Sequence, residues 1–205
     1  MTIRTHRGDL PDLSRYRGGA VAIDTETMGL AVGRDRLCVV QLSPGDGSAD
    51  VVQIPTGQAN APNLKALLAD PAILKIFHFA RFDLGALQHG LGVMPGPVYC
   101  TKIASRLSRT YTDRHGLKDL VREILGIDVS KQQQSSDWGA AELTEAQITY
   151  AASDVLHLHA LKARLDVMLA REGRTELADA CFRFLPDRVR LDLAGWSADD
   201  VFAHS

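Results

Sequence analysis

The stretch "VAIDTETMGL", residues 21 to 30, begins as a buried strand and then places Asp24 and Glu26 where its apolar run ends. Side chains two residues apart on a strand point to the same face, so these carboxylates are expected to converge and repel each other. Two interpretations stay open at this point. Both acids are solvated turn residues, or they belong to a site for a hard divalent cation, which binds oxygen ligands. The second interpretation requires further carboxylates from elsewhere in the chain.

Around this strand, alternating turn signals and apolar runs predict a mixed sheet. Apolar runs at 20–24, 37–42 and 50–54 indicate an antiparallel meander, with the turn cluster "SPGDGSA" between the last two. The remaining elements are expected as a helix in "NLKALLAD", a strand in "ILKIFH", a helix in "ARFDLGALQHG" closed by Gly90, a strand in "PVYC", and helices over 102–109 and 116–125. This order predicts an α/β fold, in which helices cover a mixed sheet and sites lie at strand ends.

The longest helix is predicted over residues 145 to 170. Thr144 and Gln147 form a capping-box pattern at its start, and Gly173 follows its end. Tyr150 and Asp154 are four residues apart and therefore share one face of this helix. Because they interrupt an apolar stripe, they face either a cleft or, in the plainer alternative, the solvent.

The composition of the chain suits one folded unit. Its 205 residues and 45% hydrophobic content can bury one substantial core, so we expect a single domain over 1–205. The segment 175–205 is too short for a domain but is rich in aromatic residues. Such groups need burial, which predicts a segment that packs on its own domain or forms an oligomer.

Cysteine usage and hydropathy predict a cytoplasmic protein. The three cysteines are odd in number and lack metal-type spacing, which fits a reducing compartment. The N-terminal sequence lacks an apolar signal core, and no run approaches the roughly 20 apolar residues that cross a bilayer. We therefore expect a protein that is neither secreted nor inserted in a membrane.

Charge argues against binding of long nucleic acids. The net charge is −2 and the isoelectric point about 6.4, whereas affinity for many phosphates comes from clustered Lys and Arg. One local stretch, residues 101 to 123, has six basic residues against three acidic ones and contains Arg106, Arg109 and Arg114. It is either a solvated helix face or a rim that contacts the phosphates of a short substrate.

A third acid, Asp83 in "KIFHFARFDLGAL", is predicted in the first turn of a helix, where a lone Asp often complements the helix dipole. Asp24, Glu26, Asp83 and Asp154, with Tyr150 shortly before the last, resemble in order and context the acidic set of the DEDD 3'-to-5' exonucleases. The match is to the tyrosine-containing subgroup, in the ribonuclease D-like branch. It rests on the stretches "AIDTETMGL", "HFARFDLGAL", "TKIASRL", "GLKDLVREILGIDVSK" and "QQSSDWGAAELTEAQITYAASDVLHLHAL".

This resemblance implies a ribonuclease H-like fold and two-metal hydrolysis. It implies two Mg²⁺ or Mn²⁺ ions about 4 Å apart, which support removal of a 5'-nucleotide. In that arrangement Asp24 bridges both ions, Glu26 and Asp154 complete the first site, and Asp83 supports the second. Tyr150 either deprotonates or orients the attacking water; both roles stay open, because a free phenol has a pKa of about 10.

Substrate contacts are also implied. The resemblance places the backbone near Thr25 and the carboxylate of Glu26 at the terminal 3'-hydroxyl. Leu30 either inserts between the last two bases or belongs to the core. The loop before the long helix contributes substrate contacts or merely capping and packing. The residues implied there are Gln134, Ser136, Asp137 and Trp138. Selection of a short substrate requires that both of its ends are enclosed, and the candidates for a basic cap on the 5' phosphate are Arg106, Arg109 and Arg114.

Two positions depart from the commonest ribonuclease D pattern, in which Asn is expected at Phe79 and Asp at Cys100. Neither is a metal-binding acid, so the departures bear on substrate preference. The chain leaves no room for the helical accessory domains of ribonuclease D. It looks most like the compact nano-RNases, which cleave dinucleotides and form rings of subunits.

We therefore expect a metal-dependent 3'-5' exoribonuclease for dinucleotides and very short RNA, assembled as a homo-oligomer with an octamer as the expected size. The alternative is a general ribonuclease D-like enzyme that trims longer RNA or DNA ends. A catalytically silent nucleic-acid-binding module is disfavoured, because the four acids and Tyr150 are all present.

Overall fold

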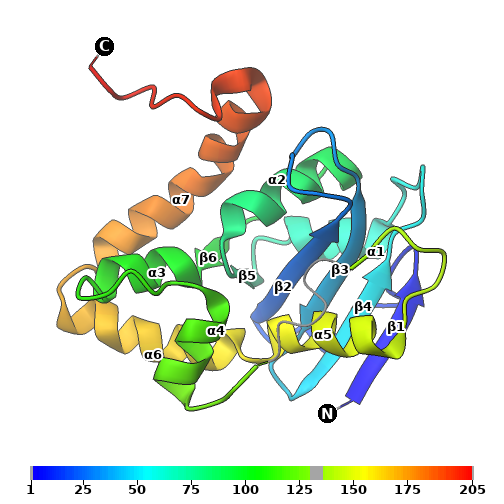
Figure 1. The fold of residues 1–205 in the computed structure, drawn as a ribbon, viewed down its shortest axis with the longest axis horizontal. Coiled ribbons are helices and arrows are strands. Elements are labelled where there is room, and N and C mark those ends of the chain that lie inside the picture. The colour runs from blue at the N-terminus through cyan, green and yellow to red at the C-terminus, as the bar shows by residue number, and fades with distance from the viewer. Residues whose placement is uncertain (1, 130–135, 205) are drawn as a thin grey trace.

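The computed structural model describes residues 2–129 and 136–204. Its centre is a six-stranded sheet with the strand order β1-β4-β3-β2-β5-β6 (Figure 1). The strands are β1 (Thr2–Arg7), β2 (Ala20–Thr27), β3 (Leu37–Ser43), β4 (Ser48–Gln53), β5 (Leu74–Phe77) and β6 (Val98–Cys100). Strands β2, β3 and β4 form an antiparallel meander, while β1, β5 and β6 join by parallel pairing. The predicted mixed α/β sheet is confirmed.

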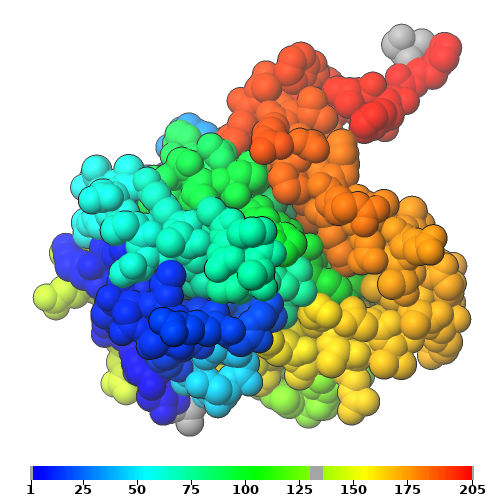
Figure 2. Space-filling model, turned by 180° about the vertical axis from the view of Figure 1, so that it is seen from behind, coloured from blue at the N-terminus to red at the C-terminus, as the bar shows by residue number. Residues whose placement is uncertain are grey.

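Helices cover both faces of this sheet. They are α1 (Pro62–Ala69), α2 (Ala80–Leu91), α3 (Thr101–Ser108), α4 (Leu117–Leu120), α5 (Glu145–Leu156), α6 (Leu158–Arg171) and α7 (Thr175–Leu191), with short helical turns at Ser14–Tyr16, Val121–Leu125 and Asp192–Trp196. Helix α5 packs across β2, β3 and β4, and Figure 2 shows the turquoise and green chain of α1 and α2 on the opposite side. Strand β3 is buried along its whole length, because both of its faces are covered.

The helix predicted over 145–170 is divided in two. The capping box at its start is confirmed, since the Gln147 amide donates to the Thr144 hydroxyl at 3.2 Å and the Thr144 amide donates to the Gln147 side chain at 2.9 Å. Its end is different, because His157 has φ −101° and ψ −6° and separates α5 from α6. Helix α5 packs on the sheet, whereas α6 packs chiefly against α3. Because the helix is interrupted at His157, the apolar residues of α5 can pack on the sheet while those of α6 pack on α3.

Two other boundaries differ from the sequence prediction. Helix α2 continues through Gly90 and ends before Gly92, which has the left-handed φ of 68° that favours glycine. Strand β1 was not predicted, because "TIRTHR" is a polar strand at the sheet edge with several side chains exposed. Its pairing with β4 depends on the backbone and gives no apolar signal in the sequence.

The C-terminal segment has two parts. Helix α7 packs against α2, α3, α6 and β6, and it buries Phe182 and Leu185. Beyond Leu191 the chain projects from the body of the molecule (Figures 1 and 2), with Trp196 exposed and the Phe202 side chain 74% exposed. No helix in the described part of the chain is both long and apolar enough to cross a bilayer.

Candidate active site

Three carboxylates meet where β2 leaves the centre of the sheet. Asp24 and Glu26 point to the face that α5 covers, and Asp154 points toward them from the last turns of α5. One carboxylate oxygen from each of the three lies within 4.8 Å of the others. The register of β2 against β3 shifts between Glu26 and Thr27, and such irregularities commonly redirect side chains beside active sites.

Asp83 reaches the same cleft from the other side of the sheet. It lies in the first turn of α2, where the helix dipole favours a negative charge. Thr25, which points away from Asp24 and Glu26, donates its hydroxyl to Asp83 at 2.7 Å and fixes its orientation. The four predicted acids therefore surround one cavity of about 360 Å³. Its lining consists of Asp24, Thr25, Glu26, Leu30, His78, Phe79, Phe82, Asp83, Lys102, Gly116, Leu117, Lys118, Asp119, Tyr150 and Asp154.

Negative charge in this cleft exceeds the charge that opposes it. Burial, together with the neighbouring carboxylates, raises the pKa of Asp24 well above its usual range and the pKa of Glu26 to about 8. Burial also raises the pKa of Asp83 and of Asp154 to about 7. For Asp154 a hydrogen bond from Tyr150 and the charge of Lys118 act in the opposite direction. A divalent cation would offset this repulsion, and an all-carboxylate donor set fits Mg²⁺ or Mn²⁺.

Tyr150 is held beside the acids as a protonated phenol. Burial and the charges of Asp154, Glu26 and Asp24 raise its pKa above the ordinary value, because a phenolate would be one more negative charge. Its hydroxyl interacts with Asp154 and lowers the pKa of that carboxyl, and its ring packs against Trp138 with 6.1 Å between centroids. The geometry therefore suits hydrogen-bond donation better than proton removal.

Burial bears on two of the open alternatives and decides that for Leu30. Leu30 is 88% exposed at the cleft, so the interpretation of Leu30 as a core residue is wrong. Trp138 is only 3% exposed and lies against Tyr150, which fits the packing role, and its direct contact with substrate stays a prediction. Gln134 lies outside the described residues.

The prediction of three phosphate-binding arginines needs a correction at Arg109. Its side chain is 1% exposed and forms a buried ion pair with Glu123. It also donates to the Ser105 hydroxyl at 3.2 Å and to the Arg114 carbonyl at 2.9 Å. These contacts hold the loop after α3, and Arg109 is not among the residues that line the cleft. Arg106 and Arg114 are exposed, so their predicted role stays open.

Sequence reasoning missed His78, Lys102 and Lys118 in the cleft. His78 follows β5, and its Nδ1 lies 2.9 Å from the Thr101 hydroxyl. Burial and the charge of Lys102 lower the pKa of His78 to about 3, so the ring is neutral. The position of His78 directly after a strand was a usable signal, because sites in such folds gather at strand ends.

Comparison with known proteins agrees with this geometry. Residues 11–170 match the family described as 3'-5' exonuclease. Ribonuclease D of Gluconacetobacter diazotrophicus is 36% identical over 167 residues, which are 82% of this chain and 42% of that protein. Ribonuclease D of Escherichia coli is 34% identical over 155 residues, which are 75% and 40% respectively. The chain thus spans less than half the length of these curated relatives.

Several solved structures match over the full length of both chains, and two of them bear on the site. They are Brucella melitensis NrnC with bound Mg²⁺, at 63% identity and a TM-score of 0.97, and the same NrnC bound to pGG, at 64% and 0.97. The chain therefore belongs to the DEDD-type 3'-5' exonuclease family, in the ribonuclease D-like branch that also contains NrnC.

Proposed function

We propose that this protein is a metal-dependent 3'-5' exoribonuclease that hydrolyses dinucleotides and very short oligonucleotides to 5'-mononucleotides. The observation that carries the proposal is the excess of carboxylate charge at the end of β2. The similarity to an NrnC that binds Mg²⁺ and pGG supports it.

The carboxylates would hold two ions, Mg²⁺ or Mn²⁺. When bound, such a pair supplies charge stabilisation and water activation for phosphodiester hydrolysis. Asp24, Glu26, Asp83 and Asp154 would hold these ions, with Asp24 shared by both, Glu26 and Asp154 serving one and Asp83 serving the other. Thr25 orients Asp83 through its 2.7 Å hydrogen bond, which fixes the position of that carboxylate before substrate binds.

Tyr150 would position the attacking water rather than deprotonate it. Its protonated phenol lies beside Asp154, so the hydroxyl can orient a water between the two residues. Leu30, exposed at the edge of the cleft, would separate the last two bases. The backbone of Thr25 and the carboxylate of Glu26 would contact the terminal 3'-hydroxyl.

Three observations support short substrates. The net charge is −2, the cleft volume is about 360 Å³, and few basic residues surround the cleft. Arg106 and Arg114 are the exposed candidates for a 5' phosphate. The competing function is general trimming of longer RNA or DNA ends, which the similarity to the longer ribonuclease D proteins favours.

A length series separates the two functions. Release of mononucleotides is measured from 5'-phosphorylated RNA of two, three, five and twenty residues and from matched DNA, with Mg²⁺ and with EDTA. We expect the dinucleotide to have the highest kcat/KM and no turnover in EDTA. Equal rates on the dinucleotide and the longest RNA would replace our proposal with general trimming.

We further propose one domain over 1–205, in which 175–205 supports a cytoplasmic homo-oligomer, an octamer by similarity. Exposed Trp196 and Phe202, beyond a helix that packs on its own chain, support the assembly. The three unpaired cysteines support the location. Light scattering of the wild type and of a Trp196→Ser/Phe202→Ser variant tests the assembly, and an unchanged mass would exclude the tail from the interface.

A further inference from the structure

Strand β3 contains two polar side chains in an otherwise apolar environment. All seven of its residues, Leu37–Ser43, are buried, because α5 packs on one face of the sheet and α2 contacts β3 from the other. Five of the seven are apolar, and the polar ones are Gln41 and Ser43. Burial of a polar group costs free energy unless it is hydrogen-bonded, so the partners of these two side chains indicate what each one does.

Ser43 is held by the hairpin between β3 and β4. Its hydroxyl donates to the Ser48 carbonyl at 2.7 Å and accepts from the Gly45 amide at 3.3 Å. The donor and an acceptor of this hydroxyl are therefore both used inside the turn. None of these three residues is among those that line the carboxylate cleft. Ser43 thus serves the fold.

Gln41 is paired with a cleft residue instead. It lies directly opposite Asp24 in the antiparallel register of β2 and β3, so the two side chains project from the same face of the sheet. Its side-chain amide donates to Asp24 Oδ2 at 3.3 Å. Its Oε1 is buried and has no hydrogen-bond partner among the described residues. Within residues 2–129 and 136–204, the bond to Asp24 is therefore the only one that the Gln41 side chain makes.

The direction of this hydrogen bond follows from the charge of Asp24. An ionised carboxylate accepts hydrogen bonds and donates none, so the amide turns its NH₂ group toward Asp24 and its oxygen away. The charged groups around Asp24 are the carboxylates of Glu26, Asp83 and Asp154, which are also acceptors. Gln41 therefore adds a donor to a carboxylate whose charged neighbours offer none.

We propose that Gln41 is a positioning residue for the metal site and that its amide holds the Asp24 carboxylate in the orientation that binds divalent cations. Gln41 is not among the residues that line the cleft, so it acts through Asp24 and not on the substrate. Carboxylates that bind metal ions are commonly held by such outer hydrogen bonds, and loss of one typically lowers metal affinity about 10- to 100-fold. The inference rests on the proposed metal-dependent function and adds to it a residue that prepares the site.

The test uses variants that remove the donor and keep a side chain of similar size. Gln41→Met is unbranched like glutamine, and Gln41→Leu is a second variant of similar volume. Ser43→Ala is the matched control, because it removes the other buried polar side chain of β3, two residues away on the same face. The Kd for Mn²⁺ is measured from the electron paramagnetic resonance signal of free Mn²⁺, and stability is measured by urea unfolding in EDTA. Neither readout depends on turnover.

A positioning role and a merely structural role predict opposite results. We expect both Gln41 variants to raise the Kd for Mn²⁺ about tenfold or more. Their free energy of unfolding in EDTA should not fall, because an apolar group replaces an amide whose buried oxygen has no partner. Ser43→Ala should be less stable than the wild type, since it leaves the Ser48 carbonyl without its donor, and its Kd for Mn²⁺ should be unchanged. The Mg²⁺ concentration for half-maximal dinucleotide hydrolysis should rise in the Gln41 variants alone.

Three results would overturn the positioning role, and they differ in what they leave standing. Unchanged Mn²⁺ affinity in both Gln41 variants would overturn it and leave the metal-dependent function in place. An equal loss of Mn²⁺ affinity in Ser43→Ala would do the same, because the effect would then come from a general loosening of β3. A wild type that binds no Mn²⁺ would overturn the proposed function together with this inference.

Discussion

Two aspartates on neighbouring parts of the sheet have opposite surroundings. Asp50 on β4 is 2% exposed and has a full set of partners. It accepts from Arg15 at 2.6 Å and from the Tyr16 hydroxyl at 2.5 Å, and the His6 ring lies at 2.8 Å. Its charge is therefore met inside the protein, as expected for an acid that contributes to stability.

Asp24 on β2 has no comparable set. Its side-chain partner is the Gln41 amide at 3.3 Å, and its charged neighbours Asp83, Asp154 and Glu26 are all acids. The negative charge of Asp50 is thus balanced by protein groups, whereas that of Asp24, on the same sheet, is not. Repulsion between these carboxylates raises the free energy of the folded protein, and a bound divalent cation would offset that repulsion. The contrast separates an acid that stabilises the fold from one that serves a reaction.

The largest expected effect is on catalysis at Asp24. Asp24→Ala should lower kcat/KM on a dinucleotide by at least about 100-fold, because charge stabilisation by metal ions is worth several kcal/mol. The free energy of unfolding in EDTA should not fall, since carboxylate repulsion is relieved. Urea unfolding and steady-state kinetics check both. A variant that keeps more than about a tenth of the activity would remove Asp24 from the site.

The next largest expected effect is the loss of kcat when the hydroxyl of Tyr150 is removed. Tyr150→Phe should lower kcat by about 10²-fold with a smaller change in KM, because it removes the hydroxyl that positions water and keeps the ring against Trp138. Steady-state kinetics over a pH series measure this. Unchanged kcat and an unchanged pH profile would show that Tyr150 only packs.

Asp50→Ala should produce the opposite pattern to Asp24→Ala. The loss of its carboxylate leaves the buried Tyr16 hydroxyl without its acceptor, which we expect to cost about 1–3 kcal/mol of unfolding free energy. Dinucleotide hydrolysis by the folded protein should stay within about twofold of wild type. If Asp50→Ala were as stable as wild type, or as inactive as Asp24→Ala, the contrast between the two acids would fail.

The smallest effect is a pH dependence of stability without metal. The pKa of Glu26 rises from 4.5 to about 8, and those of Asp83 and Asp154 rise from 3.8 to about 7. The folded state then binds more protons than the unfolded state, so stability is lost as pH rises between these limits. In EDTA the Tm should fall from about pH 5.5 to about pH 8.5, and Mg²⁺ should raise it most at the higher pH.

Glu26→Gln is the control for this pH series, because it removes the carboxyl whose pKa is raised to about 8. Its Tm in EDTA should depend less on pH than that of the wild type. A wild-type Tm in EDTA that rises over the same range would contradict the uncompensated charge at this site.

The sheet and its acids were predictable because their signals are local. Alternation along β2 places Asp24 and Glu26 on one face, and a capping box marks the start of the helix that carries Asp154. Arg109 was not predictable in the same way. Its burial depends on an ion pair with Glu123, fourteen residues away. The sequence of a basic segment does not show which of its arginine or lysine side chains faces the solvent and which faces the interior.

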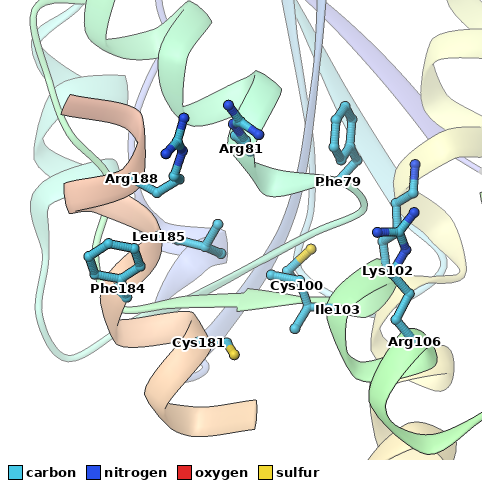
Figure 3. A pocket seen from close by; sticks show the side chains of 10 residues that line it. All are labelled: Phe79, Arg81, Cys100, Lys102, Ile103, Arg106, Cys181, Phe184, Leu185 and Arg188. Carbon is cyan, nitrogen blue, oxygen red and sulfur yellow. The ribbon is translucent and has the colours of Figure 1, made fainter. Parts of the chain in front are cut away.

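A second pocket, which adjoins the catalytic cleft between α2, α3 and α7, shows the same limit (Figure 3). Phe79, Lys102 and Leu185 come from three separate segments, and only tertiary packing of α7 against α2 and α3 brings them to one cavity. The sequence indicated a departure from the ribonuclease D pattern at Phe79 but not what that residue faces. Aromatic content in the C-terminal segment predicted burial without distinguishing α7, which packs, from the tail that projects.

The most direct test of the contrast between Asp24 and Asp50 is anomalous scattering from crystals of the active protein grown with Mn²⁺. We predict two peaks about 3.5–4 Å apart, one among Asp24, Glu26 and Asp154 and one between Asp24 and Asp83. No peak should lie at Asp50, whose charge is already met by protein groups. Crystals of a protein with intact Mn²⁺-dependent hydrolysis but no peak at Asp24 would contradict the account.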